Sequence, residues 1–122
     1  MRAVRCILAL VAAAGAPAAF AHAFLEHASP RVGSTVEAPP SRVMLHFSQD
    51  LEPAFSSVQV FDATGREVDG KDAKVDAHDA SSLAVSLPAL SPGKYRVKWR
   101  VLSTDTHVTE GDFAFQVRPP AR

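Results

Sequence analysis

Tyr95-Arg96-Val97-Lys98-Trp99-Arg100-Val101 carries the strongest structural signal in this chain of 122 residues. Apolar and basic side chains alternate along it, which is typical of a β-strand because successive side chains point to opposite faces. Exposing the apolar face would cost about 25 cal/mol for each Å² of apolar surface left in water. We therefore expect the aromatic and valine side chains to face a core and the basic side chains to face solvent.

Shorter β-prone runs extend this pattern on both sides of the stretch. They lie at 24–28, 42–47, 55–61, 83–87 and 113–117, with an irregular pair around 67–75. Turn-forming residues separate them at 39–40, 63–65, 91–93 and 110–111. The acid-rich segment 66–80 is expected to be a surface loop or a weak edge strand. About seven strands with this spacing predict an all-β domain, an immunoglobulin-like β-sandwich that lacks the Cys and Trp signature of antibody domains.

The first 21 residues differ in composition from the rest. Two arginines precede a short apolar run at 6–14, and Ala19-Phe20-Ala21 has the small-x-small pattern that signal peptidase cleaves. Gly15 and Pro17 interrupt the run before it reaches the roughly 20 apolar residues that a membrane-spanning helix needs. We expect residues 1–21 to be a cleaved secretory signal peptide. Residues 22–122 would then be a single exported domain, located outside the cytoplasm and not embedded in the membrane.

Charge and cysteine content exclude several classes of protein. The chain has 13 basic and 13 acidic side chains, so it lacks the excess of positive charge that marks proteins that bind nucleic acid. Its one cysteine, Cys6, lies in the expected signal peptide, so the exported domain would have neither a disulfide nor a thiolate. A domain of about 100 residues buries roughly 60–70% of its unfolded surface, which is enough to fold without such links.

Cleavage after Ala21 would make His22 the first residue of the exported domain. Its α-amine and its imidazole Nδ1 could then close a chelate ring on one metal ion. An α-amine has a pKa of roughly 7.7–8.0, so it loses its proton to a metal more readily than a lysine does. A histidine left at this position incidentally is the alternative, and the position alone does not decide between them.

A second pair of metal-ligand types follows the strongest strand. Asp105 and His107 lie in the polar segment Ser103-Thr104-Asp105-Thr106-His107. In an extended chain, residues two apart face the same side, so the carboxylate and the imidazole can converge on one ion. Taken alone, an Asp-x-His pattern most often means a solvated loop. It indicates a metal site here only in combination with His22.

His22, Asp105 and His107 together would offer three nitrogens and an oxygen. This set suits tetragonal Cu(II), which has the highest affinity among the divalent first-row ions, although zinc also accepts such ligands. The exported domain has no cysteine and a single methionine, Met44, so it lacks the soft ligands that Cu(I) prefers. These ligand types by themselves do not exclude zinc, and they disfavour a site that shuttles between Cu(I) and Cu(II).

The order of these motifs resembles the CopC family of periplasmic copper-resistance proteins. The resemblance spans nearly the whole exported domain and is carried above all by 22–25, 45–48 and 99–107. It implies a Greek-key β-sandwich or barrel in which the amine and imidazole of His22 bind Cu(II) with Asp105 and His107. Some members also have a methionine-rich Cu(I) site between the middle strands. Segment 62–80 has no methionine, so we expect a Cu(II)-only member. We predict that each exported chain holds one Cu(II) ion by static coordination, without turnover.

Four other residues of ligand type receive weaker assignments. In a regular strand that begins at His22, Glu26 shares the face of His22 and His27 points away, so Glu26 is the better candidate for orienting a ligand. His46 alternates with apolar residues and is expected at the surface or the rim of its sheet. His78 lies in an acidic loop and is given no role.

Three functions are compatible with these features. The resemblance favours a monomeric, non-enzymatic copper carrier for resistance or homeostasis, which buffers Cu(II) or delivers it to an inner-membrane transporter. A copper-dependent oxidative enzyme is an alternative, because a terminal histidine brace on a β-sandwich also occurs in lytic polysaccharide monooxygenases. Those chains are much longer, and no Tyr or Trp flanks Asp105 and His107. A metal-free adhesion or assembly domain is the remaining alternative, and it would bind no copper.

Overall fold

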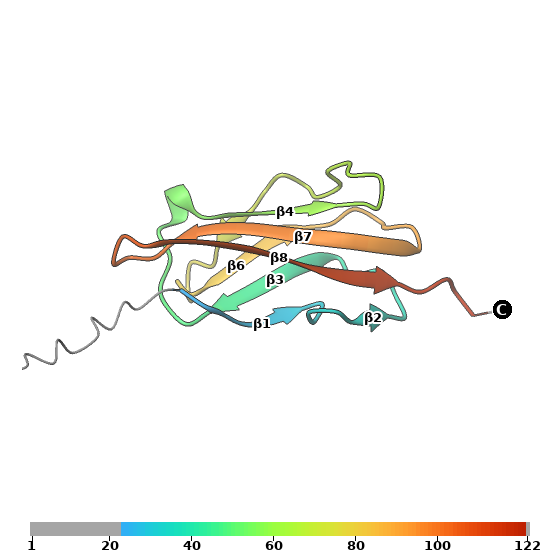
Figure 1. The fold of residues 1–122 in the computed structure, drawn as a ribbon, viewed down its shortest axis with the longest axis horizontal. Coiled ribbons are helices and arrows are strands. Elements are labelled where there is room, and N and C mark those ends of the chain that lie inside the picture. The colour runs from blue at the N-terminus through green and yellow to red at the C-terminus, as the bar shows by residue number, and fades with distance from the viewer. Residues whose placement is uncertain (1–22, 122) are drawn as a thin grey trace, which may run out of the picture.

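The computed structural model describes residues 23–121, which form two packed four-stranded β-sheets (Figure 1). The first sheet has the order β1-β3-β6-β5, with β1 at Leu25–Ser29, β3 at Arg42–Phe47, β6 at Ser82–Ser86 and β5 at Lys74–Val75. The second has the order β2-β8-β7-β4, with β2 at Thr35–Val36, β8 at Val108–Val117, β7 at Gly93–Leu102 and β4 at Ser57–Phe61. The predicted all-β, immunoglobulin-like Greek-key sandwich is confirmed.

The chain changes sheet repeatedly, as a Greek-key sandwich requires. The connections from β3 to β4 and from β6 to β7 both cross between the sheets, and a short 3-10 helix, η1 at Pro53–Phe55, lies on the first of them. Strand pairs are antiparallel except for β2, which runs parallel to β8. Within the described residues, no helix is long and apolar enough to cross a membrane.

The core lies between the sheets and is filled by the alternating apolar positions. Tyr95, Val97 and Val101 of β7 are buried, and Trp99 packs against the same cluster while the basic residues between them are exposed. The apolar positions of β3, β4, β6 and β8 supply the rest of this cluster. The Tyr95 hydroxyl donates a hydrogen bond to the Ser91 carbonyl, 2.5 Å away, which resembles the tyrosine corner of immunoglobulin-like domains. The predicted core face of this strand is therefore confirmed.

Strand β8 is longer than the sequence suggests, because a predicted turn at 110–111 is wrong. Gly111 lies inside β8, directly opposite Trp99 in the register with β7. A Cβ atom at Gly111 would lie 2.5 Å from Cζ2 of the Trp99 indole. Glycine is therefore present here to admit a ring across the strand pair, one of the recognised roles of glycine within strands. The turn follows instead at 103–107.

The middle of the chain is less regular than predicted. The expected strand at 55–61 begins only at Ser57, because Pro53–Phe55 forms η1. The expected pair around 67–75 reduces to β5 and a bridge between Phe61 and Glu67. The buried Asp69 carboxylate accepts a hydrogen bond from the Val60 amide at 2.8 Å, and the Val68 amide donates to the Val60 carbonyl at 2.8 Å, so a side chain supplements the backbone bonds along the edge of β4.

Candidate metal centre

The segment Ser103–His107 forms a tight hairpin loop between β7 and β8, at the end of the sandwich where β1 begins (Figure 1). The Ser103 amide donates to the His107 carbonyl at 3.0 Å, and the Thr106 amide donates to the Ser103 carbonyl at 2.9 Å. Thr106 has a positive φ of 72°, a conformation that lets the chain reverse within so few residues. The loop therefore holds Asp105 and His107 on a short, hydrogen-bonded turn.

Ser103 organises the interior of this loop. Its side chain is fully buried, and its hydroxyl is hydrogen-bonded to the Asp105 carboxylate. The same oxygen lies 3.3 Å from the His107 amide and 3.2 Å from the His107 carbonyl. The sequence analysis assigned no role to Ser103. It does continue the core-facing positions of β7, and a polar residue at a core position is the signal that could have identified it.

The structure brings Asp105 and His107 together. An Asp105 carboxylate oxygen lies 3.3 Å from Nδ1 of His107, and the two side chains are 39% and 35% exposed. The hydrogen bond from Ser103, followed by the contacts with His107, lowers the pKa of Asp105 below its ordinary value. The carboxylate is therefore ionised at neutral pH, in a position accessible to a metal ion from solvent.

The start of the described chain is anchored beside this loop. His22 itself lies outside the described residues. Its neighbour Ala23 is buried, and the Ala23 carbonyl accepts a hydrogen bond from the Thr109 hydroxyl at 2.9 Å. Phe24 is joined to Ser48 by hydrogen bonds of 2.9 and 2.8 Å. The sequence analysis gave no role to Thr109 or to the Ser48 side chain, since these contacts join segments far apart in the sequence.

The described residues supply only part of a metal-binding set. Between residues 23 and 121, no group of three or more His, Cys, Asp or Glu side chains is arranged to hold a metal ion. Asp105 and His107 therefore provide two donor groups of the types that Cu(II) and zinc accept. The described residues add no third side chain of ligand type to this pair.

The weaker candidates Glu26 and His27 do not alternate as predicted. A β-bulge between Leu25 and His27 shifts the register of β1 on β3, so Glu26 and His27 are both exposed. The prediction that the two residues face opposite sides is therefore wrong, because a bulge adds a residue and breaks the period of two.

Glu26 and His27 both contact His46, which is half-buried on β3. Nε2 of His46 lies 3.7 Å from the Glu26 carboxylate, and its Nδ1 lies 3.1 Å from the Ser82 hydroxyl and 3.5 Å from the Asp79 carboxylate. The rings of His27 and His46 stack with centroids 4.6 Å apart and an angle of 13° between their planes. The lone pairs of two nearly parallel rings lie in nearly parallel planes, so they do not converge on one ion.

Comparisons with known proteins agree with the resemblance seen in the sequence. The CopC domain model matches residues 25–118. Copper resistance protein C of Xanthomonas campestris pv. juglandis is 36% identical over 124 residues, covering 96% of this chain and 97% of that protein. The crystal structure of CopC from Methylosinus trichosporium OB3b is 42% identical with a TM-score of 0.77, covering 83% of this chain and 98% of that chain. Copper transport protein CutJ of Bacillus subtilis is 27% identical over 99 residues, which are 80% of this chain but 18% of that protein. The chain belongs to the CopC family.

Proposed function

We propose that residues 22–122 form an exported periplasmic protein that captures one Cu(II) ion for copper resistance or homeostasis. The α-amine and imidazole of His22 and the side chains of Asp105 and His107 would bind the ion, after signal peptidase has removed residues 1–21. The observation that carries the proposal is the pairing of Asp105 with His107 next to the anchored Ala23. The relatives named for copper resistance and copper transport support copper as the ion.

Chain geometry supports the inclusion of His22. Consecutive Cα atoms lie about 3.8 Å apart, so the residue before Ala23 is close to wherever Ala23 is held. The hydroxyl of Thr109 holds the Ala23 carbonyl, and Thr109 is two residues along β8 from His107. A histidine at position 22 is therefore within reach of the loop that carries Asp105 and His107.

The donor set favours a carrier over an enzyme. Three nitrogens and a carboxylate oxygen would suit Cu(II) in a tetragonal geometry, and residues 22–122 have no cysteine and a single methionine, so they lack a cluster of soft ligands for Cu(I). The ionised Asp105 also offsets part of the charge of the bound ion. Delivery to an inner-membrane transporter is supported by CutJ, in which a region similar to this chain is a minor part of a copper transport protein.

A Cu(II) titration followed by electron paramagnetic resonance tests the proposal. We expect a protein that begins at His22 to bind one equivalent tightly, with a nitrogen-rich tetragonal spectrum. A protein with one extra residue before His22 has an amide in place of the α-amine, and we expect it to lose that spectrum. Identical binding by the two forms would contradict a role for the chain terminus.

Single substitutions separate the roles of the ligands. We expect His22→Ala and His107→Ala each to weaken Cu(II) binding by more than about 100-fold, and Asp105→Ala by about 10- to 100-fold, measured by competition with a chelator of known affinity. His78→Ala is the matched control, since His78 is exposed and lies in a different loop. Wild-type affinity in His22→Ala would eliminate this ligand set.

The affinity for Cu(II) should also fall as the pH is lowered, because protons compete for the same lone pairs.

A further inference from the structure

Four basic side chains form a row along the outer face of β7, on the sheet face opposite the core. Lys94, Arg96, Lys98 and Arg100 are all exposed and occupy every second position of the strand. Because a strand rises about 3.3–3.4 Å per residue, neighbouring members of this basic row are separated by about 7 Å. The row contains four of the 11 basic residues between His22 and Arg122.

Most of the charge of the basic row is not neutralised within the fold. Arg96 forms an ion pair with Asp112 at 2.6 Å, whereas Lys94, Lys98 and Arg100 form none among residues 23–121. Lys98 places its ammonium nitrogen 5.8 Å from the centre of the Phe61 ring. Asp62, at the edge of the row, instead accepts hydrogen bonds from the amide and hydroxyl of Thr64 within its own turn.

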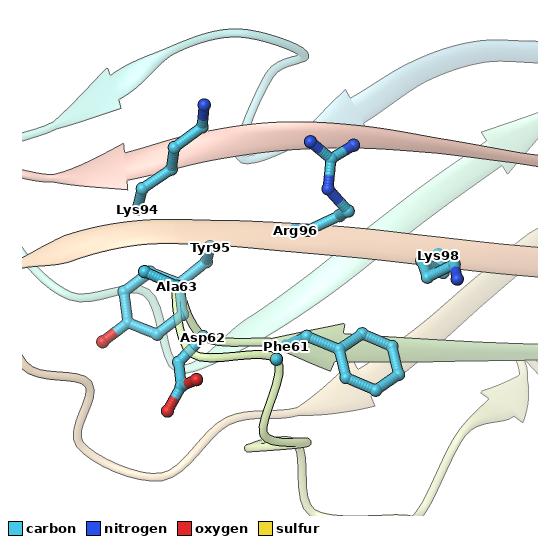
Figure 2. Close-up of a pocket in the computed structure, with 8 residues that line it drawn as sticks. Phe61, Asp62, Ala63, Lys94, Tyr95, Arg96 and Lys98 are labelled. Atoms are coloured by element: carbon cyan, nitrogen blue, oxygen red, sulfur yellow. The ribbon is translucent and has the colours of Figure 1, made fainter.

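Two hollows follow the basic row and make its surface concave. The first, of about 490 Å³, is lined by Lys94, Arg96, Lys98 and Phe61, among others, and Figure 2 shows these side chains on β7 and its neighbour β4. The second, of about 580 Å³, continues past Lys98 to Arg100 and is also lined by Glu110 and Asp112 of β8. Lys98 lines both hollows, and we call the two together the furrow along β7.

We propose that this furrow binds an extended, acidic peptide segment of a partner protein. An extended peptide also presents alternate side chains about 7 Å apart on one face, so carboxylates at every second position match the spacing of the basic row. The furrow has room for such a chain, and Phe61 offers an apolar contact beside it. The three cations without an ion pair supply the complementary charge, which contributes both attraction and specificity.

The shape and charges of this face favour a peptide over an anionic membrane. Glu110 and Asp112 of β8 stand directly beside Arg100 and Lys98 in the strand register, so a flat anionic surface would meet carboxylates as well as cations. The large exposed apolar side chains that could insert into a bilayer lie on other segments; they are Phe24, Val32, Phe55 and Val108. Glu110 and Asp112 line the β8 side of the second hollow, whereas Ser57 and Gln59 on its β4 side are uncharged. A narrow peptide over β4 and β7 would meet the cations on that uncharged side.

Fluorescence anisotropy with synthetic peptides tests this proposal at low and at physiological ionic strength. The probe is an eight-residue peptide of alternating Glu and Thr, compared with a block peptide of the same composition in which the glutamates are consecutive. We expect the exported domain to bind the alternating peptide more tightly, with an affinity that falls as salt is added. The variant Lys94→Gln/Lys98→Gln/Arg100→Gln should weaken that binding by at least about tenfold.

A second triple variant provides the matched control. Arg31→Gln/Lys71→Gln/Lys74→Gln removes the same charge from exposed positions outside the basic row, and we expect a change of less than about twofold. Both variants should keep the circular dichroism spectrum and the Cu(II) titration of the wild type, which separates this proposal from the proposed function. Equal weakening in the two variants would overturn the proposal, because binding would then follow net charge alone. Equal affinity for the two peptides, or row-dependent binding only to phosphatidylglycerol vesicles, would also overturn it.

Discussion

Ser103 shows how one small buried side chain can set the geometry of an exposed pair. Its hydroxyl contacts the Asp105 carboxylate and the backbone of His107, while the side chains of Asp105 and His107 remain open to solvent. In metal centres, groups that hydrogen-bond to a ligand fix its orientation and its basicity. Ser103 is therefore a positioning residue for the proposed copper site.

We expect Ser103→Ala to weaken Cu(II) binding by about tenfold, because Asp105 and the loop backbone lose their shared partner. The free energy of unfolding should fall by about 1–2 kcal/mol, the usual cost of removing one partner of buried hydrogen bonds. Chelator competition and chemical denaturation measure the two effects. Ser57→Ala, at an exposed serine of β4, is the control and should change neither quantity. Unchanged copper affinity in Ser103→Ala would show that the loop keeps its shape without this hydroxyl.

At the level of elements, the pairing of β7 with β8 brings the strongest strand signal together with the candidate loop. Ten residue pairs join the two strands, and the 103–107 loop closes their shared end. The pairing passes Gly111 without a break because the Trp99 ring occupies the space that a side chain would need. The edge of this indole then packs on Phe47 with ring centroids 5.1 Å apart, which ties the strand pair to the other sheet.

We expect Gly111→Ala to lower the free energy of unfolding by about 1–3 kcal/mol, the typical cost of forcing an extra methyl group into a packed site. Trp99 fluorescence should change as the ring is displaced. In a Trp99→Leu background the space opens, so the same substitution should cost less, and denaturant unfolding of the four proteins measures this coupling. Equal costs in the two backgrounds would contradict the role assigned to the ring.

At the scale of the whole molecule, aspartate side chains hold many of the connections between strands. Asp62, Asp72 and Asp79 accept hydrogen bonds from backbone amides or hydroxyl groups, which lower the pKa of each carboxyl below its ordinary value. Asp72, for example, accepts from the Ser86 amide at 2.9 Å. Asp72 thereby fastens the irregular segment between β4 and β6 to β6, while Asp62 and Asp79 stabilise turns within their own segments.

The stability that these carboxylates contribute should be lost in acid. Because their pKa values are lower in the folded state, the contribution is complete above the unfolded value of about 4 and disappears as the pH falls through the folded values. We expect the melting temperature to drop steeply below about pH 4 and Asp72→Asn to make that drop shallower. Thermal melts across this range provide the test. The control is Asp50→Asn, at an exposed aspartate that has no side-chain hydrogen bond among the described residues. If the melting temperature falls equally steeply with decreasing pH in the wild type and in Asp72→Asn, this account is contradicted.

Local patterns in the sequence were enough to predict the sandwich, its main strands and the pairing of Asp105 with His107. Alternation reports which face of a strand is buried. Asp105 and His107 lie close together as predicted, but they meet in a tight turn and not along the extended chain that the prediction assumed. The resemblance to the CopC family likewise depends on motifs that lie in order along the chain. His22 lies outside the described residues, and its part in copper binding stays a prediction.

Apart from the local role of Ser103 and the short helix η1, the features that the sequence did not reveal depend on residues far apart along the chain. Gly111 is a strand residue because of Trp99, and the contacts from Thr109 to Ala23 and from Ser48 to Phe24 exist only once the strands have assembled. The bulge at Glu26 likewise belongs to the pairing of β1 with β3. The pattern of residues along a strand shows which of its sides is apolar. It does not show which distant side chain packs against that side or accepts a hydrogen bond from it, because these contacts form only when the two sheets meet.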